Sequence, residues 1–370
     1  MLSRIRESRG PCADAVRPRL RSSPPTTPPA PLKLVQTGKM SCEVNGKKVG
    51  ALGFGLMGFT WRPDPPPVDQ ALEALQAAFE SGMTLWNGAE FYGTPQYNTM
   101  TLLEKYFTHR PGDADKICLI MKGGMDLTSQ KPDGSPEGVR RSIDNILKQL
   151  NGKKKVDLFS YARRDPNTPL KTTFDTIQKE YVETGKIGGI SLSECSAETI
   201  HEAAKLGFKI EAVEVELSMF SPDILGNGVV AACSEHGIPI TAYSPIGRGM
   251  LTGKFKDTQS VEHLGFLSKF PRFEAEAMKH NLKLVEQVET LAKEKGCSPA
   301  QLAISWVQHQ GGRPGRPTVV PIPGATTVAR VKENSKLIPL SKDELAKLDK
   351  IVDEFETKGD RYPSSVPTNT

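Results

Sequence analysis

From Ala51 onward, the chain alternates between short apolar runs and longer stretches whose apolar positions repeat with a helical period. Most of the apolar runs are continuous, such as Ile-Cys-Leu-Ile-Met at 117–121, which is typical of strands buried on both faces of a parallel sheet. The segment 211–216 differs, because polar residues interrupt it at every second or third position. The pattern predicts eight strands, near 51–55, 83–87, 117–122, 156–161, 187–191, 211–216, 238–244 and 318–322.

Helical stretches lie between these runs. In 68–79, apolar residues stand at positions 68, 71, 72, 75, 78 and 79, and Ser81-Gly82 follows as a stop signal. The stretches 137–150 and 173–183 show the same pattern, and each is followed by a glycine two residues later. Eight strands that alternate with helices over about 290 residues favour a (β/α)8 barrel, an α/β fold, over an open doubly wound sheet.

The glycines of 53–58 spell G-x-G-x-x-G, which is the fingerprint of open sheets that bind dinucleotides. That motif needs a helix directly after it, whereas 57–61 leads into Pro63 and the triple proline at 65–67. We therefore expect no helix at this point and reject the open-sheet interpretation. Ahead of the barrel, Asn45-Gly46 predicts a β-hairpin with a type I′ turn. The barrel domain is expected to span residues 40–370.

Residues 1–39 differ in composition from the rest of the chain. They hold seven prolines and carry six Arg and two Lys against Glu7 and Asp14, so the net charge of +5 comes from this segment and the remainder carries −1. We interpret 1–39 as a disordered extension. An Arg- and Ser-rich, acid-poor start can also act as a mitochondrial transit peptide, although the prolines argue against the amphipathic helix this needs. We expect a cytoplasmic protein, with a mitochondrial one as the alternative.

Composition also bears on partners. The body is electrically balanced and shows no basic stripe, so no nucleic acid is expected as a partner. The chain contains no run of 18 apolar residues, so no membrane span is predicted. The six cysteines stand far apart without a C-x-x-C pair, which is typical of reduced thiols and indicates neither a disulfide framework nor a metal site. We expect a monomer or a weak homo-oligomer.

In a (β/α)8 barrel, chemistry takes place where the strands end, at the carboxyl-terminal mouth. Tyr92 follows the predicted second strand, and Lys122 ends the third. A phenol is a weak acid at neutral pH, and a nearby ammonium lowers its pKa by stabilising the phenolate, so this pair could donate a proton. Taken alone, the two residues are better interpreted as a wall residue and a solvated loop charge.

Four stretches resemble signatures of the aldo-keto reductase family. Residues 242–254 (AYSPIGRGMLTGK) are similar to its strand-seven motif, and 322–334 (IPGATTVARVKEN) to its site for the cofactor's 2′-phosphate and adenine. Residues 87–93 (NGAEFYG) are similar to its D-T-A-x-x-Y-G motif, and 301–307 (QLAISWV) to the helix before strand eight. The resemblance covers roughly residues 44–356. It implies a (β/α)8 barrel that uses NADPH/NADP+ and a small-molecule carbonyl substrate.

The departures from the family pattern are specific. The family's catalytic set is Asp, Tyr, Lys and His, but here Asn87 takes the Asp position and Ala162 the His position. Glu214 stands where the family usually has Gln, and Leu192 where it has Asn. This combination resembles the fungal pyridoxal reductase branch of the family, which implies pyridoxal as the substrate and pyridoxine as the product.

The resemblance also implies the roles of individual residues. Hydride would pass from NADPH to the carbonyl carbon while Tyr92 donates a proton to the oxygen, with Lys122 and Asn87 completing the catalytic set. Because Asn87 carries no charge, Lys122 should be less compensated and act more strongly on Tyr92. Arg330 would pair with the 2′-phosphate. The implied cofactor-binding residues are Ser191, Glu214, Tyr243, Ser244, Pro245, Gly247, Arg248, Gly324, Thr326, Thr327, Arg330, Glu333 and Asn334.

Further candidates concern the substrate. Ala162 removes a donor to the carbonyl, and Arg163 or Arg164 could supply positive charge instead, although neighbouring side chains at a strand end point in opposite directions. Trp61, in the proline-rich loop, could stack on the substrate. The alternative function is a regulatory or redox-sensing barrel that binds NADPH with little turnover, similar to potassium-channel β subunits. The retained tyrosine–lysine pair favours the enzyme.

Overall fold

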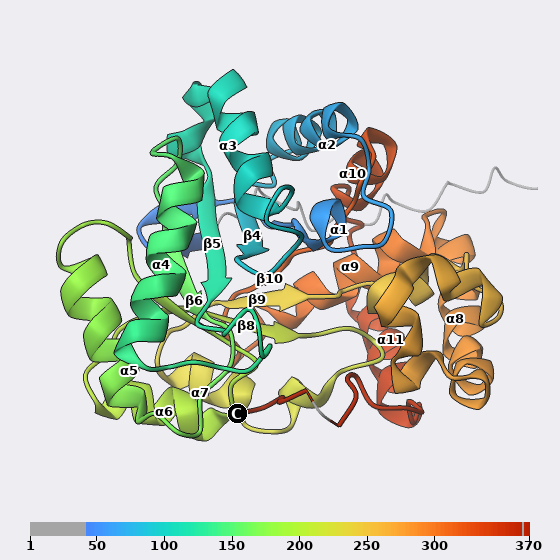
Figure 1. Cartoon of the computed structure of the whole chain (residues 1–370). Coiled ribbons are helices and arrows are strands. Elements are labelled where there is room, and N and C mark those ends of the chain that lie inside the picture. Colours follow the sequence, from blue (N-terminus) through green and yellow to red (C-terminus); the bar gives the residue numbers. More distant parts are fainter. Residues whose placement is uncertain (1–41, 365) are drawn as a thin grey trace, which may run out of the picture. The chain divides into compact units, whose positions relative to one another are not determined.

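The computed structural model describes residues 42–364 and 366–370 (Figure 1), so the extension predicted at 1–39 lies outside the described residues. Eight parallel strands form one sheet, in chain order from β3 to β10. Each of them overlaps a predicted strand. Their bounds are β3 (Phe54–Gly55), β4 (Leu85–Ala89), β5 (Cys118–Gly123), β6 (Leu158–Tyr161), β7 (Ile190–Ser193), β8 (Ile210–Glu216), β9 (Ile240–Tyr243) and β10 (Val319–Pro321).

The first and last strands of the sheet meet and close it into a barrel. The Gly53 N–H donates to the Pro321 carbonyl at 2.9 Å, and the Gly55 N–H donates to the Pro323 carbonyl at 3.3 Å. The predicted (β/α)8 barrel is therefore confirmed. The hairpin ahead of it pairs β1 (Cys42–Val44) with β2 (Lys47–Val49) in antiparallel register. Its two turn residues both have positive φ, 51° and 72°, as a type I′ turn requires.

Helices alternate with the strands and surround the barrel (Figure 1). No helix among the described residues is both long and apolar enough to cross a membrane. The α-helices are α1 (Met57–Thr60), α2 (Val68–Glu80), α3 (Thr99–His109), α4 (Pro136–Leu150), α5 (Leu170–Ile177), α6 (Ala197–Lys205), α7 (Val229–Glu235), α8 (Ala275–Lys295), α9 (Pro299–Gln310), α10 (Val328–Asn334) and α11 (Lys342–Glu354).

Two helix predictions need correction. A one-turn helix, α1, follows β3 where no helix was expected. Two contacts hold it: the Phe59 ring packs edge-on against Phe54 of the preceding strand at 5.8 Å, and Thr60 Oγ1 donates to the carbonyl of Tyr92, which is distant in sequence, at 2.9 Å. The single helix predicted at 173–183 is instead α5 followed by a π-helical turn, Gln178–Val182. The open-sheet interpretation stays rejected, because the parallel sheet is a barrel.

The interior of the barrel changes from apolar to polar along its axis. One buried cluster joins the hairpin to alternate residues of the strands: Val44, Val49, Leu85, Cys118, Ile120, Leu158, Ala212, Val320 and Ile322. Residues two positions apart share a face of a strand. Asn87, Lys122, Ser160 and Glu214 therefore continue these rows toward the carboxyl ends of the strands, and all four are buried. Glu214 in this layer accounts for one of the polar residues that interrupt the pattern of 211–216.

Candidate active site

Three side chains from three strands form a closed triangle of hydrogen bonds in the polar layer. Lys122 Nζ donates to Asn87 Oδ1 at 2.6 Å and to Glu214 Oε1 at 2.8 Å. Asn87 Nδ2 donates to Glu214 Oε2 at 2.7 Å. All three residues are at most 4 % exposed, so each charge is largely shielded from water and must be balanced locally.

Tyr92 lies against this triangle, and Lys122 is buried rather than a solvated loop charge. Lys122 Nζ is 5.1 Å from the centroid of its ring. Trp61 also contacts the phenol: its ring is stacked on that of Tyr92 at 4.9 Å with an interplanar angle of 25°. The backbone is fixed as well, because the Tyr92 carbonyl accepts from Thr60 Oγ1 and from the Thr99 N–H. The structure thus brings Tyr92, Lys122 and Asn87 together.

The electrostatics differ from the expectation that Lys122 is poorly compensated. The missing carboxylate of position 87 is replaced by that of Glu214, which forms an ion pair with Lys122. Burial raises the pKa of Tyr92, and Glu214 adds to this effect, so the opposing ammonium of Lys122 does not bring the pKa below its ordinary value. Burial acts against the charge of Lys122 too, but Glu214 and Tyr92 outweigh it, and the pKa of Lys122 is raised.

The hydroxyl of Ser191, on β7, is buried and could bind a polar group of a ligand. It is 1 % exposed, and its Oγ has no hydrogen-bond partner among the described residues. An unpartnered buried hydroxyl costs free energy, so the residue fits the carboxamide contact that the family resemblance implies. Ser160, its register partner on β6, has an unpartnered Oγ as well. Glu214, in contrast, already uses both of its oxygens within the triangle.

The residues assigned to the 2′-phosphate lie at the start of α10. Thr327 Oγ1 accepts from the Arg330 N–H at 3.3 Å. The Thr326 carbonyl accepts from Gln70 Nε2 at 2.7 Å, which ties this segment to α2. The Arg330 side chain is exposed, and within the described part of the chain nothing forms an ion pair or hydrogen bond with its guanidinium. It is therefore available to an anionic ligand.

The remaining residues of that region have mixed surroundings. Gly324 is exposed and forms a parallel bridge with Gly55 where the barrel closes. Glu333 is half-buried, and its carbonyl accepts from Gln301 Nε2 at 3.1 Å. Asn334 is 6 % exposed. All three lie on the segment that follows β10. The predicted site for the adenine end of the cofactor is therefore formed by one continuous stretch of chain.

The loop after β9 contains the other assigned residues in an unusual backbone conformation. Ser244, Gly247 and Arg248 have φ values of 52°, 56° and 56°. Non-glycine residues in this region cost free energy, so their surroundings must hold them there. Pro245 is buried, and Tyr243 is half-buried at the end of the strand. Such a loop presents its side chains in fixed directions.

A C-terminal segment that carries no family motif covers this loop. Tyr362 Oη lies 2.9 Å from Tyr243 Oη. Arg248 Nη1 donates to the Arg361 carbonyl at 2.7 Å, and the Arg248 guanidinium lies 4.6 Å from the Tyr362 ring centroid. Arg361 itself pairs with the buried Glu194 through both carboxylate oxygens, at 3.2 and 3.1 Å. We call residues 361–370 the C-terminal tail; its end lies beside α6 (Figure 1).

The two arginines after β6 point to different neighbours. Arg163 Nε donates to the Pro367 carbonyl in the C-terminal tail at 2.8 Å, and its guanidinium lies 5.9 Å from the Tyr362 ring centroid. Arg164 instead pairs with Glu202 on α6 at 2.7 Å. Of the two alternatives, Arg163 is the one on the side of the mouth.

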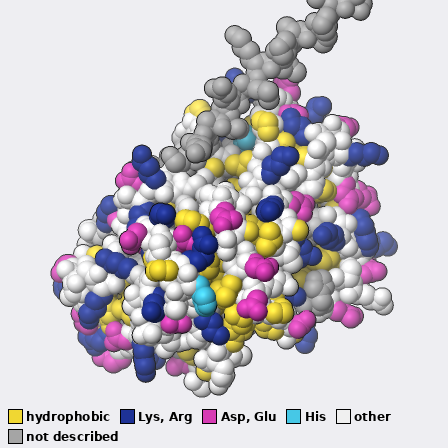
Figure 2. Space-filling view, turned by 90° about the horizontal axis from the view of Figure 1, so that it is seen from above, with side chains coloured by type: hydrophobic (Ala, Val, Ile, Leu, Met, Phe, Trp, Pro, Cys, Tyr) yellow, Lys and Arg dark blue, Asp and Glu magenta, His cyan; other side chains and the backbone are white. Residues whose placement is uncertain are grey.

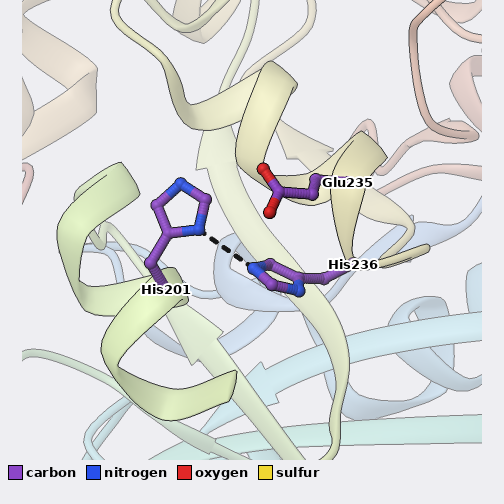
Figure 3. Close-up of side chains that lie close together, drawn as sticks. All are labelled: His201, Glu235 and His236. Atoms are coloured by element: carbon purple, nitrogen blue, oxygen red, sulfur yellow. Dashed lines mark hydrogen bonds between the residues drawn. The ribbon is translucent and has the colours of Figure 1, made fainter. Parts of the chain in front are cut away.

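Features outside the mouth belong to other parts of the barrel. His201 Nδ1 lies 3.0 Å from His236 Nε2, and Glu235 is next to them (Figure 3); all three are exposed, on α6 and at the end of α7. A hollow of about 430 Å³ lies beside the hairpin, at the opposite ends of β8 and β9 from the mouth. On the face shown in Figure 2, basic and acidic side chains are intermixed, without a patch of one sign. None of these features adjoins Tyr92.

Comparison with known proteins defines the class. The model of the aldo/keto reductase family matches residues 51–353. The chain therefore belongs to this family and is an oxidoreductase with an α/β barrel.

Two similar proteins are from fungi. "Probable pyridoxal reductase 2" of Schizosaccharomyces pombe is 39 % identical over 326 residues, covering 86 % of this chain and 96 % of that protein. "Putative pyridoxal reductase" of Saccharomyces cerevisiae is 35 % identical over 331 residues, covering 84 % and 95 %.

Solved structures share the fold. The thermostable aldo-keto reductase Tm1743, crystallised with the inhibitor epalrestat, has a TM-score of 0.65 at 25 % identity and covers 84 % of this chain and 99 % of its own. The glycerol dehydrogenase AKR11B4 of Gluconobacter oxydans has a TM-score of 0.73 at 20 % identity, covering 89 % and 99 %.

Proposed function

We propose that this protein reduces pyridoxal to pyridoxine with NADPH, and that Tyr92 donates the proton. The observation that carries the proposal is the buried contact at the mouth, where the ammonium of Lys122 lies 5.1 Å from the Tyr92 ring. The similarity to two proteins named as pyridoxal reductases supports the choice of substrate.

The surroundings of Tyr92 suit a proton donor in the direction of reduction. Because burial raises its pKa, the phenol stays protonated at neutral pH and can give its proton to a carbonyl oxygen that gains negative charge. Lys122 then stabilises the phenolate that is left. When bound, NADPH supplies the hydride, and the protein orients the reactants and balances charge.

Two observations support NADPH as the cofactor. Ser191 Oγ is buried without a partner, in the place where the family resemblance puts the nicotinamide carboxamide. Arg330 is exposed at the start of α10, and a planar guanidinium suits a 2′-phosphate. The two residues would therefore hold opposite ends of the cofactor.

Pyridoxal has chemical features that match the mouth. It is a flat, polar aromatic aldehyde with a hydroxyl beside the carbonyl group. Trp61, which covers Tyr92, offers an aromatic edge or face to such a ring. Arg163, on the side of the C-terminal tail, would pair with the phenolate oxygen of the substrate.

One observation favours a second candidate function, a barrel that binds NADPH and regulates with little turnover. The C-terminal tail bonds to Tyr243 and Arg248, which are both assigned to the cofactor, so cofactor binding could be coupled to the position of the tail. The retained Tyr92 and Lys122 favour the enzyme.

Steady-state kinetics separates the two functions. The values of kcat/KM are compared for pyridoxal, an aliphatic aldehyde and a simple aromatic aldehyde, each with NADPH and with NADH. Tyr92→Phe should lower kcat by about 10² or more, whereas Tyr97→Phe, which removes a buried hydroxyl without a partner, should not. If pyridoxal is no better than the other aldehydes, the substrate assignment fails. If no carbonyl is reduced, the regulatory function is the better one.

A further inference from the structure

The negative charge next to Lys122 comes from a different strand than the family pattern implies. In that pattern an aspartate stands at position 87 on β4 and a glutamine at position 214 on β8. Here the residues are Asn87 and Glu214, and the carboxylate of Glu214 accepts from Lys122 Nζ at 2.8 Å. Acid and amide have therefore changed places across the barrel.

We propose that Glu214 is the positioning residue that holds Lys122 charged and in place beside Tyr92, and that Asn87 is its obligatory amide partner. The proposal rests on the proposed function, in which Tyr92 and Lys122 form the proton-donating pair. It gives Glu214 a role different from the cofactor contact that the resemblance implies.

The hydrogen bonds explain why the two positions must change together. Asn87 accepts from Lys122 with its oxygen and donates to Glu214 with its nitrogen, at 2.6 and 2.7 Å. An acid paired with an amide can form all three hydrogen bonds of the triangle in either order. Two acids would bring two carboxylates to about 2.7 Å from each other, as estimated from the present contact. Two amides would leave the buried ammonium of Lys122 without a counter-charge.

The charges of this triangle affect the pKa of Tyr92. The charged and titratable groups that act on it come from several elements: Lys122 on β5, Glu214 on β8, Arg163 after β6 and Tyr362 in the C-terminal tail. Glu214 raises the pKa of Tyr92, and Lys122 lowers it. Removing the charge of Glu214 alone should therefore lower the pKa of Tyr92, and restoring a charge at position 87 should raise it again.

Four proteins test the exchange: the natural chain, Glu214→Gln, Asn87→Asp and the double variant, assayed with NADPH and pyridoxal. We expect each single variant to lose about tenfold or more in kcat. Glu214→Gln should also move the alkaline limb of the pH profile downward. The double variant should recover kcat to within about threefold of the natural chain, together with its alkaline limb. Glu211→Gln, on the same strand but paired with exposed Lys209, is the matched control and should change neither quantity.

Thermal unfolding of the same four proteins gives a readout that needs no turnover. Both single variants should lower Tm, and the double variant should recover most of the loss. If the natural chain reduces no carbonyl but Tm follows this pattern, the proposed function fails while the acid–amide exchange stands. If Tm recovers and kcat does not, Glu214 is only structural and the positioning role is wrong. If Glu214→Gln raises only the KM for NADPH and the second substitution restores nothing, Glu214 is a cofactor contact and the proposal is overturned.

Discussion

The hydroxyl of Tyr362, in the C-terminal tail, lies 2.9 Å from the hydroxyl of Tyr243 at the end of β9. Tyr243 also donates to Glu194 Oε1 at 2.8 Å, and the same carboxylate binds Arg361. Glu194 is 1 % exposed. One buried carboxylate thus joins the tail to the strand that ends beside the candidate cofactor site.

Removing the positive charge of Arg361, which pairs with Glu194, should destabilise the protein. In Arg361→Met, the buried carboxylate of Glu194 loses its closest positive charge, although Arg163 still acts on it. We expect the free energy of unfolding to fall by about 3 kcal/mol, the lower end of the range for breaking a buried pair. Urea denaturation measures this value. Lys358→Met removes an exposed pair with Glu356 and should cost only about 0–1 kcal/mol; equal losses in both variants would contradict the argument.

The same pair should make stability depend on pH. Burial raises the pKa of Glu194, but Arg361, Arg163 and Tyr243 outweigh it, so the pKa in the folded protein is below its ordinary value of 4.5. A lowered carboxyl pKa stabilises the fold above that ordinary value, and the contribution is lost as the pH falls through the folded pKa. The difference in stability between the natural chain and Arg361→Met should therefore be full at pH 7 and shrink in acid. Unfolding measured at several pH values would show a constant difference if the charge of Glu194 plays no part.

The barrel could be predicted from the sequence because strands buried on both faces leave a strong pattern. The one-turn helix α1 could not, because one of the contacts that hold it is the hydrogen bond from Thr60 to the carbonyl of Tyr92, which is distant in sequence. The local pattern before Pro63 contains no sign of that hydrogen bond.

The site was predictable in part, for a similar reason. Tyr92 and Lys122 stand where strands end, where a barrel carries its chemistry, but it was the family resemblance that assigned them to the site. The pairing of Lys122 with Glu214 joins β5 to β8 across the barrel interior, and neither strand indicates by itself which residue it will face. The contacts of Arg361 and Tyr362 come from a segment that lies beyond the family match.

Cofactor preference should depend on Arg330. Its guanidinium is exposed, and losing one charge-assisted contact costs roughly 1.5–3 kcal/mol, or about 10- to 150-fold in affinity. Arg330→Ala should weaken NADPH by this factor and leave NADH nearly unchanged, as measured by fluorescence titration. Lys332→Ala, an exposed residue of the same helix, is the control. Equal weakening of both cofactors would refute the assignment.

Residues 1–39 should be dispensable for folding and catalysis. The prediction rests on their seven prolines, on the start of the first hairpin strand at Cys42 and on a family match that begins at residue 51. A chain that begins at Met40 should keep its Tm and its kcat/KM. A large loss of either would show that the segment contributes to the barrel.

Trp61 should distinguish aromatic from aliphatic substrates. Its ring is stacked on Tyr92, so replacing it affects two things: the environment of the proton donor, which every substrate uses, and any aromatic contact with the substrate. Trp61→Leu keeps an apolar side chain but removes the ring. Stacking contributes about 0.5–1.5 kcal/mol, so kcat/KM for pyridoxal should fall about 2- to 12-fold more than that for an aliphatic aldehyde. Because both aldehydes are measured with the same variant, a change in Tyr92 cancels in the ratio. An equal fall for both substrates would mean that Trp61 only supports Tyr92, and a fall for neither would remove Trp61 from the site.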